Sequence, residues 1–266
     1  MTTTLEGYTE STFTHDGDTK AVFRTGSGPA VVVIHEVPGI TPLVADFGRR
    51  VAAAGCTAVL PSLFGTPGKE PTMFPYIAGE MVKACVSREF ATLALGRTSP
   101  VTGWLRALAR TAHAECGGPG VGVVGMCLTG GFALAMMVDD EVLAPVLSQP
   151  SLPLPIGGAR KSALGISDDD LVRVQQRVTE DGVCVLGLRF SGDSLVPPER
   201  FEALRQALGD GFIGVEIDSG KGNAHGIRAA AHSVLTEDLV AEAGHPTNDA
   251  LEQVLDHLST RLLGPA

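Results

Sequence analysis

Short apolar runs that alternate with helical patterns are the feature that most constrains the fold of this chain. Residues 30–36 read AVVVIHE, a continuous run rich in β-branched residues that is typical of a strand buried on both faces. Similar runs occupy residues 57–60, 121–124, 142–147, 183–190 and 212–217. Between most of them, apolar residues recur at the three- and four-residue spacing of an amphipathic helix. This order predicts an α/β protein with a mostly parallel central sheet and helices on both faces.

Two segments depart from that alternation. Within residues 1–28, loosely alternating stretches flank Asp16-Gly17, a turn signal, so an N-terminal hairpin is expected there. Residues 64–98 carry several prolines and a mixed pattern, which predicts an excursion over the sheet rather than one of its layers. Because neither a linker nor an internal repeat is evident, residues 1–266 are expected to form a single domain.

Composition excludes several classes of protein. The net charge is −10 and no basic patch is present, so we expect no nucleic-acid partner. No apolar run approaches the ~18 residues that suggest a membrane span, so no membrane association is expected. The polar, acidic start lacks the features of a signal peptide, which predicts a cytoplasmic protein. The expected assembly is a monomer or a small homo-oligomer.

The cysteines argue against a metal site and against a disulfide framework. The chain has five, an odd number at wide spacing and without a Cys-x-x-Cys pair: Cys56, Cys85, Cys116, Cys127 and Cys184. Only Cys127 lies in a context that calls for a chemical explanation.

That context is the stretch GVVGMCLTGG, residues 122–131. An apolar strand ends at Gly125, Cys127 follows, and a new apolar pattern begins after two glycines. Strand, sharp turn and helix together are the setting of a nucleophile elbow, where the helix N-terminus favours a thiolate. Close packing or a phosphate-binding loop are alternatives, although no Gly-x-Gly-x-x-Gly and no following lysine supports the second.

A nucleophile of this kind needs a base and a residue that orients the base. In α/β-hydrolases the chain order is nucleophile, acid, histidine, which places the acid after a later strand and the histidine after the last one. Asp193 follows the strand at 183–190, although it could equally cap the next helix. His225 and His232 both follow the last strand, whereas His35 precedes the elbow and so lies on the wrong element for the base.

With these pieces placed, the chain resembles the dienelactone hydrolase family of the α/β-hydrolase fold over about residues 30–262. The stretches IHEVPGI, GMCLTGG and SGDSLVP and a late His-Ser pair carry the resemblance. The resemblance implies Cys127 as nucleophile, Asp193 as orienting acid and a late histidine as base. His232 is favoured because HSVL is similar to the family's His-Ser-aromatic stretch. His225 is the rival base, because it fits a shorter distance from the last strand.

The resemblance also implies supporting roles for other residues. Glu36 matches a glutamate near the resting thiol that controls when the thiolate forms. Backbone N–H groups of Val37 and Leu128 would form the oxyanion hole. Arg88 and Arg228 would hold the carboxylate of a substrate like the family's namesake lactone.

The expected function is therefore cysteine-dependent hydrolysis of a lactone or ester of a small, carboxylate-bearing molecule, without cofactor or metal. Thr129, where most elbows have glycine, and a long segment after residue 148 put the dienelactone itself in doubt, because either could reshape the pocket. A thioesterase, a non-catalytic ligand-binding scaffold and a redox role for Cys127 are the alternatives. No resolving cysteine near Cys127 supports the last of these.

Overall fold

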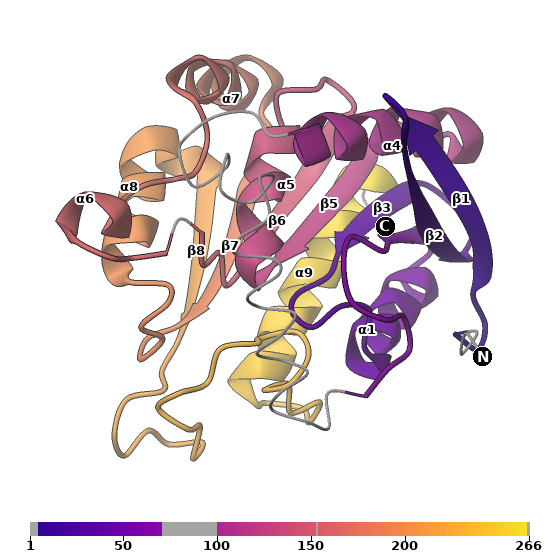
Figure 1. The fold of residues 1–266 in the computed structure, drawn as a ribbon. Coiled ribbons are helices and arrows are strands. Elements are labelled where there is room, and N and C mark those ends of the chain that lie inside the picture. Colours follow the sequence, from indigo (N-terminus) through magenta and orange to yellow (C-terminus); the bar gives the residue numbers. More distant parts are fainter. Residues whose placement is uncertain (1–4, 71–99, 153, 265–266) are drawn as a thin grey trace.

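The computed structural model describes residues 5–70, 100–152 and 154–264. Its centre is an eight-stranded sheet in the order β1-β2-β4-β3-β5-β6-β7-β8 (Figure 1). The strands are β1 Thr9–His15, β2 Asp18–Gly26, β3 Ala30–Ile34, β4 Thr57–Pro61, β5 Val121–Met126, β6 Val142–Ser148, β7 Val185–Phe190 and β8 Phe212–Ile217. From β4 to β8 all neighbours are parallel, whereas β1 and β2 form an antiparallel hairpin that joins the sheet along β4. This confirms the mostly parallel sheet and the N-terminal hairpin.

Helices cover both faces of this sheet. They are α1 Pro42–Ala53, α4 Pro100–Cys116, α5 Gly130–Met136, α6 Gly158–Lys161, α7 Asp168–Asp181, α8 Pro198–Leu208 and α9 Pro246–Leu262, with short 3₁₀ turns at Cys127–Thr129 and Gly209–Gly211. The expected excursion lies largely outside the described residues, because nothing between 71 and 99 is described.

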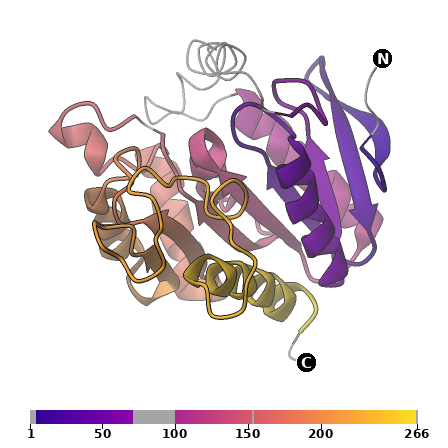
Figure 2. The same cartoon turned by 90° about the horizontal axis from the view of Figure 1, so that it is seen from below.

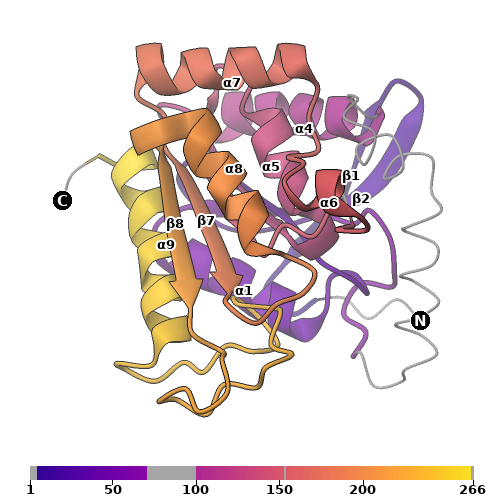
Figure 3. The same cartoon turned by 90° about the vertical axis from the view of Figure 1, so that its left-hand side faces the viewer.

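The core is divided by the sheet into two layers. On one face α1 and α9 pack through side chains such as Phe47 and Leu251, and Figure 2 shows both helices on that side. On the other face α4, α5, α7 and α8 pack through Trp104, Phe132 and Phe201. Figure 3 shows β7 and β8 enclosed between α9 and α8. The β3 residues are completely buried because both of their faces are covered, which explains their uninterrupted apolar sequence.

Local sequence signals fix where several helices begin and end. The side chain of Thr41 accepts a hydrogen bond from the Val44 amide at the start of α1, and Ser167 does the same for Asp170 in α7. The helix α7 ends at Gly182, which adopts the left-handed conformation that glycine tolerates. These caps satisfy backbone groups that the helix itself leaves unpaired.

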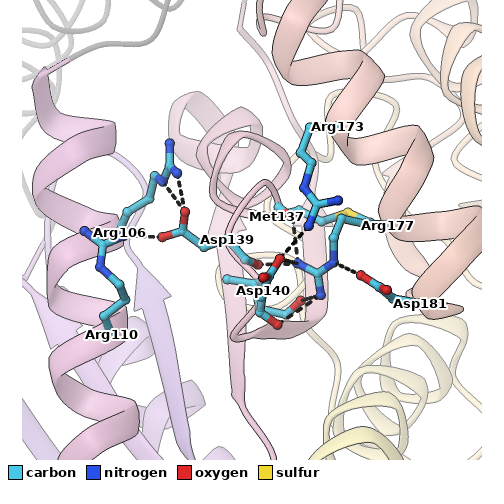
Figure 4. Close-up of polar contacts among 9 residues, drawn as sticks. Arg106, Arg110, Met137, Asp139, Asp140, Arg173, Arg177 and Asp181 are labelled. Carbon is cyan, nitrogen blue, oxygen red and sulfur yellow. Dashed lines mark hydrogen bonds and ion pairs between the residues drawn. The ribbon is translucent and has the colours of Figure 1, made fainter.

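A buried arginine joins α7 to the turn before β6, at the end of the sheet opposite the carboxyl ends of its strands (Figure 4). Arg177 is 1% exposed and pairs with Asp181 at 2.5 Å. Its guanidinium donates to the backbone carbonyls of Met137, Asp139, Asp140 and Val142. These carbonyls lie between α5 and β6, so Arg177 supplies donors to several buried polar groups of one turn.

We expect Arg177→Ala to lower the free energy of unfolding by about 3 kcal/mol, because it leaves buried carbonyls without donors. Arg173 lies one turn earlier on α7 and pairs with Asp140. Its side chain is 37% exposed, so it serves as a matched control in which the arginine is not buried. Arg173→Ala is expected to cost less than about 0.5 kcal/mol. Urea denaturation would measure both, and equal losses would contradict the structural role assigned to Arg177.

Candidate active site

Cys127 stands at the turn between β5 and α5 in a conformation that few side chains adopt. Its φ is +55°, in the left-handed region. The turn is tight enough that a Cβ on Gly125 would lie 2.5 Å from the carbonyl oxygen of Thr129, and a Cβ on Gly130 would lie 2.6 Å from Cα of Pro150. Both glycines are therefore required by close backbone approach. This is the geometry of a nucleophile elbow, which directs Cys127 away from the sheet at the start of α5.

Asp193 and His232 reach the same edge of the sheet from two separate loops. Asp193 follows β7 and is 6% exposed, and His232 lies in the long connection between β8 and α9. The two side chains meet with Asp193 Oδ2 and His232 Nδ1 2.6 Å apart. A carboxylate at this nitrogen fixes which ring nitrogen carries the proton, so Nε2 is left to act as base.

The ring of His232 has an unusual electrostatic environment. Burial alone would lower its pKa, but hydrogen bonding and charge from Asp193 and from the nearby Cys127 raise that pKa to about 11. The Nε2 atom is buried and has no hydrogen-bond partner of regular geometry among the described residues. Cys127 is therefore close enough to this ring to influence its pKa.

Backbone contacts hold the histidine loop in place. Asp238 Oδ2 accepts hydrogen bonds from the amides of His232, at 2.8 Å, and Ser233, at 3.0 Å. Its other carboxylate oxygen accepts from Nε of Arg228 at 2.7 Å. Burial would raise the pKa of Asp238, but Arg228 and the two amides outweigh it and lower that pKa. Asp238 is therefore an ionised anchor for the backbone that carries His232.

The loop that carries Asp193 is held by a second buried arginine. Arg189, at the end of β7 and 2% exposed, donates from Nε to the carbonyl of Val196 and from Nη2 to that of Ser191. These two hydrogen bonds hold the backbone before and after Asp193. The acid itself accepts from the Leu195 amide at 2.9 Å through Oδ1, which leaves Oδ2 for His232.

Glu36 lies directly after β3, buried against the histidine loop. Its carboxyl group accepts hydrogen bonds from the hydroxyls of Ser233, at 2.7 Å, and Thr236, and from the amide of Gln149 at 3.2 Å. Burial raises the pKa of Glu36, and these donors and His232 oppose the rise. The carboxyl group therefore bridges the end of β3 to the loop that carries the base.

The two expected oxyanion donors lie on either side of this cluster. Among the loops and turns of the described residues, the backbone amide of Val37 makes no hydrogen bond to another backbone group. Val37 also lines a hollow of about 220 Å³ together with Glu36, Thr41, Ser233 and Thr236. The Val37 amide therefore lies at this hollow, whereas Leu128 is not one of the residues that line it.

The hydroxyl of Thr129 points into the protein and does not line the pocket floor. The residue is completely buried, and its Oγ1 lies 2.9 Å from the carbonyl of Ile34 and 3.2 Å from that of His35. The same atom accepts from the Met126 amide at 3.0 Å. The hydroxyl thus joins the elbow to the end of β3.

Two further predicted site residues that the structure describes do not contact the Asp193–His232 pair. His225 is exposed, and its ring contacts that of His245 at 5.3 Å beside a separate groove between β8 and α9. Arg228 is 60% exposed and pairs with Asp238. Arg88 falls outside the described residues.

Two polar residues near the nucleophile were not anticipated from the sequence. Ser151 is completely buried, and its Oγ lies 3.4 Å from Sγ of Cys127. Gln149 has a φ of +35° and binds Glu36. Both follow β6, and their position after a buried strand that runs parallel to β5 was the available signal.

Within the described ranges, no three potential metal-ligating side chains come together. In the same part of the chain, no helix is long and apolar enough to cross a membrane.

The sheet order, the elbow between β5 and α5 and the Asp193–His232 pair together define an α/β-hydrolase. A sequence model of the dienelactone hydrolase family matches residues 18–262. The chain belongs to this family, and it is accordingly a hydrolase of the ester and lactone class.

Solved structures agree on the fold. A Klebsiella pneumoniae protein described as a dienelactone hydrolase is 20% identical, with a TM-score of 0.60 and coverage of 95% of this chain and 98% of its own. A dienelactone hydrolase-like promiscuous phosphotriesterase from metagenomic libraries is 16% identical, with a TM-score of 0.60 and coverage of 96% and 98%. A cold-adapted esterase from an Arctic intertidal metagenomic library is 17% identical, with a TM-score of 0.57 and coverage of 97% and 96%.

Among curated proteins, YghX of Escherichia coli K12, described as a hydrolase fragment, is 46% identical over 55 residues. That match spans 19% of this chain and about half, 47%, of YghX.

Replacement of the two late histidines should separate them. We expect His232→Ala to reduce ester hydrolysis by roughly 10³- to 10⁴-fold, because only His232 contacts Asp193. His225→Ala should change the rate by less than about twofold. Steady-state kinetics with an activated aryl ester would measure both, and a large loss in the His225 variant would reverse the assignment.

The raised pKa of His232 also predicts how stability depends on pH. The folded state holds this proton more tightly than the unfolded state, whose pKa is the ordinary 6.5. The resulting stabilisation is complete below about pH 6.5 and is lost as pH rises toward the folded pKa of about 11. Urea denaturation from pH 5.5 to 9 should therefore show wild type losing its advantage over His232→Gln as pH rises, whereas a constant difference would contradict the coupling.

Proposed function

We propose that the protein hydrolyses a small ester or lactone by covalent catalysis at Cys127. The observation that carries this proposal is the 2.6 Å contact between Asp193 and His232, whose ring also interacts with the cysteine of the elbow. An acid, an imidazole and a thiol in this order form a nucleophile with its base and orienting residue.

The first half of the reaction forms a thioester. The thiolate of Cys127 attacks the carbonyl carbon, and the oxygen becomes an oxyanion that accepts hydrogen bonds from the amides of Val37 and Leu128. Each such donor typically lowers the barrier by roughly 3 kcal/mol. The C–O bond to the ester or ring oxygen then breaks, and His232 donates its proton to the departing oxygen.

The second half regenerates the enzyme. Neutral His232 takes a proton from water, which attacks the thioester carbonyl and forms a second oxyanion at the same amides. The C–S bond breaks, the carboxylic acid leaves, and the thiolate of Cys127 re-forms beside the imidazolium. Since Asp193 stabilises that imidazolium, one pair of side chains serves both halves.

Glu36 is proposed to restrain the thiolate until substrate binds, because a negative charge near sulfur disfavours a second one. Its anchoring by Ser233, Thr236 and Gln149 keeps the carboxyl group beside the base. Faster alkylation of Cys127 in Glu36→Gln would support this role, and an unchanged rate would contradict it.

The proposed substrate class is supported by the family and by relatives described as an esterase and a dienelactone hydrolase. A carboxylate-bearing substrate requires a cation near the site. Arg88 and, after release from Asp238, Arg228 are the proposed partners. A thioesterase is the second candidate, because the intermediate at Cys127 is itself a thioester.

A substrate panel tests the proposal most directly. Lactones, aryl esters and acyl thioesters would be offered to wild type and Cys127→Ala, with acyl-enzyme detected by intact-protein mass spectrometry. We expect hydrolysis and an acyl adduct in wild type only. Cys184→Ser removes a partly exposed thiol far from the elbow and is expected to behave as wild type. Equal hydrolysis by the Cys127→Ala variant would contradict the proposed nucleophile.

A further inference from the structure

His35 is a completely buried histidine that the mechanism above does not use. It lies directly after β3, one residue before Glu36 and two before the expected oxyanion donor Val37. Burial lowers the pKa of His35 to about 4, so the ring is neutral near pH 7. A neutral imidazole has one donor nitrogen and one acceptor nitrogen, and its partners decide which is which.

The structure assigns the tautomer. The backbone N–H of Leu63, after β4, points at Nε2 of His35 at 3.0 Å, so Nε2 is the acceptor. The proton therefore resides on Nδ1, which lies 3.0 Å from the carbonyl oxygen of Glu36 and donates to it. The ring of Phe64 packs edge-on against the imidazole, with ring centroids 4.5 Å apart. The side chain is thus fixed on two sides by the loop after β4.

The peptide that His35 holds is the one that carries the oxyanion donor. The carbonyl of Glu36 and the N–H of Val37 belong to a single planar unit, in which the two groups point in opposite directions. The Gly39 amide also donates to the Glu36 carbonyl, at 2.8 Å. Two donors on the oxygen therefore set the direction of the N–H on the other side of the plane.

The elbow is connected to the same segment. The hydroxyl of Thr129 lies within 3.2 Å of the backbone carbonyls of Ile34 and His35. Thr129 belongs to the turn that carries Cys127 and Leu128. The same hydroxyl also lies 2.8 Å from the carbonyl of Met126 in the elbow, so the end of β3 packs against the turn that carries Cys127. The His35 ring contacts the carbonyl of the Glu36–Val37 peptide on the other side.

We propose that His35 is a positioning residue for the oxyanion hole, whose Nδ1–H orients the Glu36–Val37 peptide so that the Val37 N–H faces the reacting carbonyl oxygen. This inference rests on the proposed function, because it assumes that the reaction forms an oxyanion. It assigns no proton transfer and no substrate contact to His35.

Two isosteric variants separate the two hydrogen bonds of the ring. In His35→Asn the side-chain amide nitrogen occupies the place of Nδ1 and keeps the donor to Glu36. In His35→Gln the side-chain oxygen reaches the place of Nε2 and keeps the acceptor for Leu63, but the donor to Glu36 is lost. Comparable midpoints of thermal unfolding for the two variants would show that the two substitutions destabilise the protein to a similar extent.

Two reactions of Cys127 then distinguish an oxyanion defect from a damaged site. Acylation by a 4-nitrophenyl ester passes through an oxyanion, whereas alkylation by iodoacetamide forms the C–S bond as iodide leaves and creates no oxyanion. We expect His35→Gln to slow acylation roughly 10- to 100-fold with KM nearly unchanged. Its alkylation rate should stay within about twofold of wild type, and His35→Asn should acylate within about threefold of wild type.

Each outcome is decisive. Equal acylation by His35→Gln and wild type would overturn the inference and leave the proposed function standing. Parallel losses of acylation and alkylation would also overturn it, because His35 would then support the whole site rather than the oxyanion hole. Absence of acylation in wild type would overturn the proposed function itself.

Discussion

The strained turn at Cys127 is the constraint on which the rest of the site depends. A positive φ at a residue with a side chain is unfavourable, and it persists only where the surroundings determine it. Here β5 enters the turn completely buried, α5 leaves it buried, and Gly125 and Gly130 allow backbone to approach backbone. The Thr129 hydroxyl then ties the turn to the end of β3. Packing around the turn therefore fixes the position of the Cys127 sulfur relative to the loops that carry Asp193 and His232.

Around that point, the site is assembled by polar side chains with little solvent exposure whose partners lie in the backbone. Arg189 brackets the Asp193 loop, Asp238 accepts the amides of the histidine loop, and His35 contacts the segment before Val37. Each such group is satisfied by several hydrogen bonds, which is the condition for a buried polar group to stabilise a fold. Loops that carry catalytic groups are usually mobile. These anchors give them the fixed geometry that the chemistry requires.

Much of the fold could be predicted because its signals are local. Buried parallel strands require continuous apolar runs, and helix starts at Thr41 and Ser167 are marked by their own side chains. Cys127 and Asp193 were likewise identifiable as candidate site residues, because each follows shortly after such a strand. The choice between His225 and His232 was not local. Both lie in one irregular connection, and only the path of that connection shows that His232 meets Asp193 whereas His225 turns toward His245.

By itself, the sequence determined the alternation of strands and helices, the sharp turn at Cys127 and the position of Asp193 after β7. These follow from periodicity, from glycine at close backbone approaches and from strand ends. Tertiary structure alone decided that Arg228 pairs with Asp238, that Thr129 is sealed inside the elbow and that His35 holds the peptide of Val37. The physical reason is that none of these contacts follows from a local pattern. The Thr129 bond joins two strand ends that the sheet order brings together. Arg228 and Asp238 meet through the path of one irregular connection, and the ring of His35 is oriented by the Leu63 amide after β4.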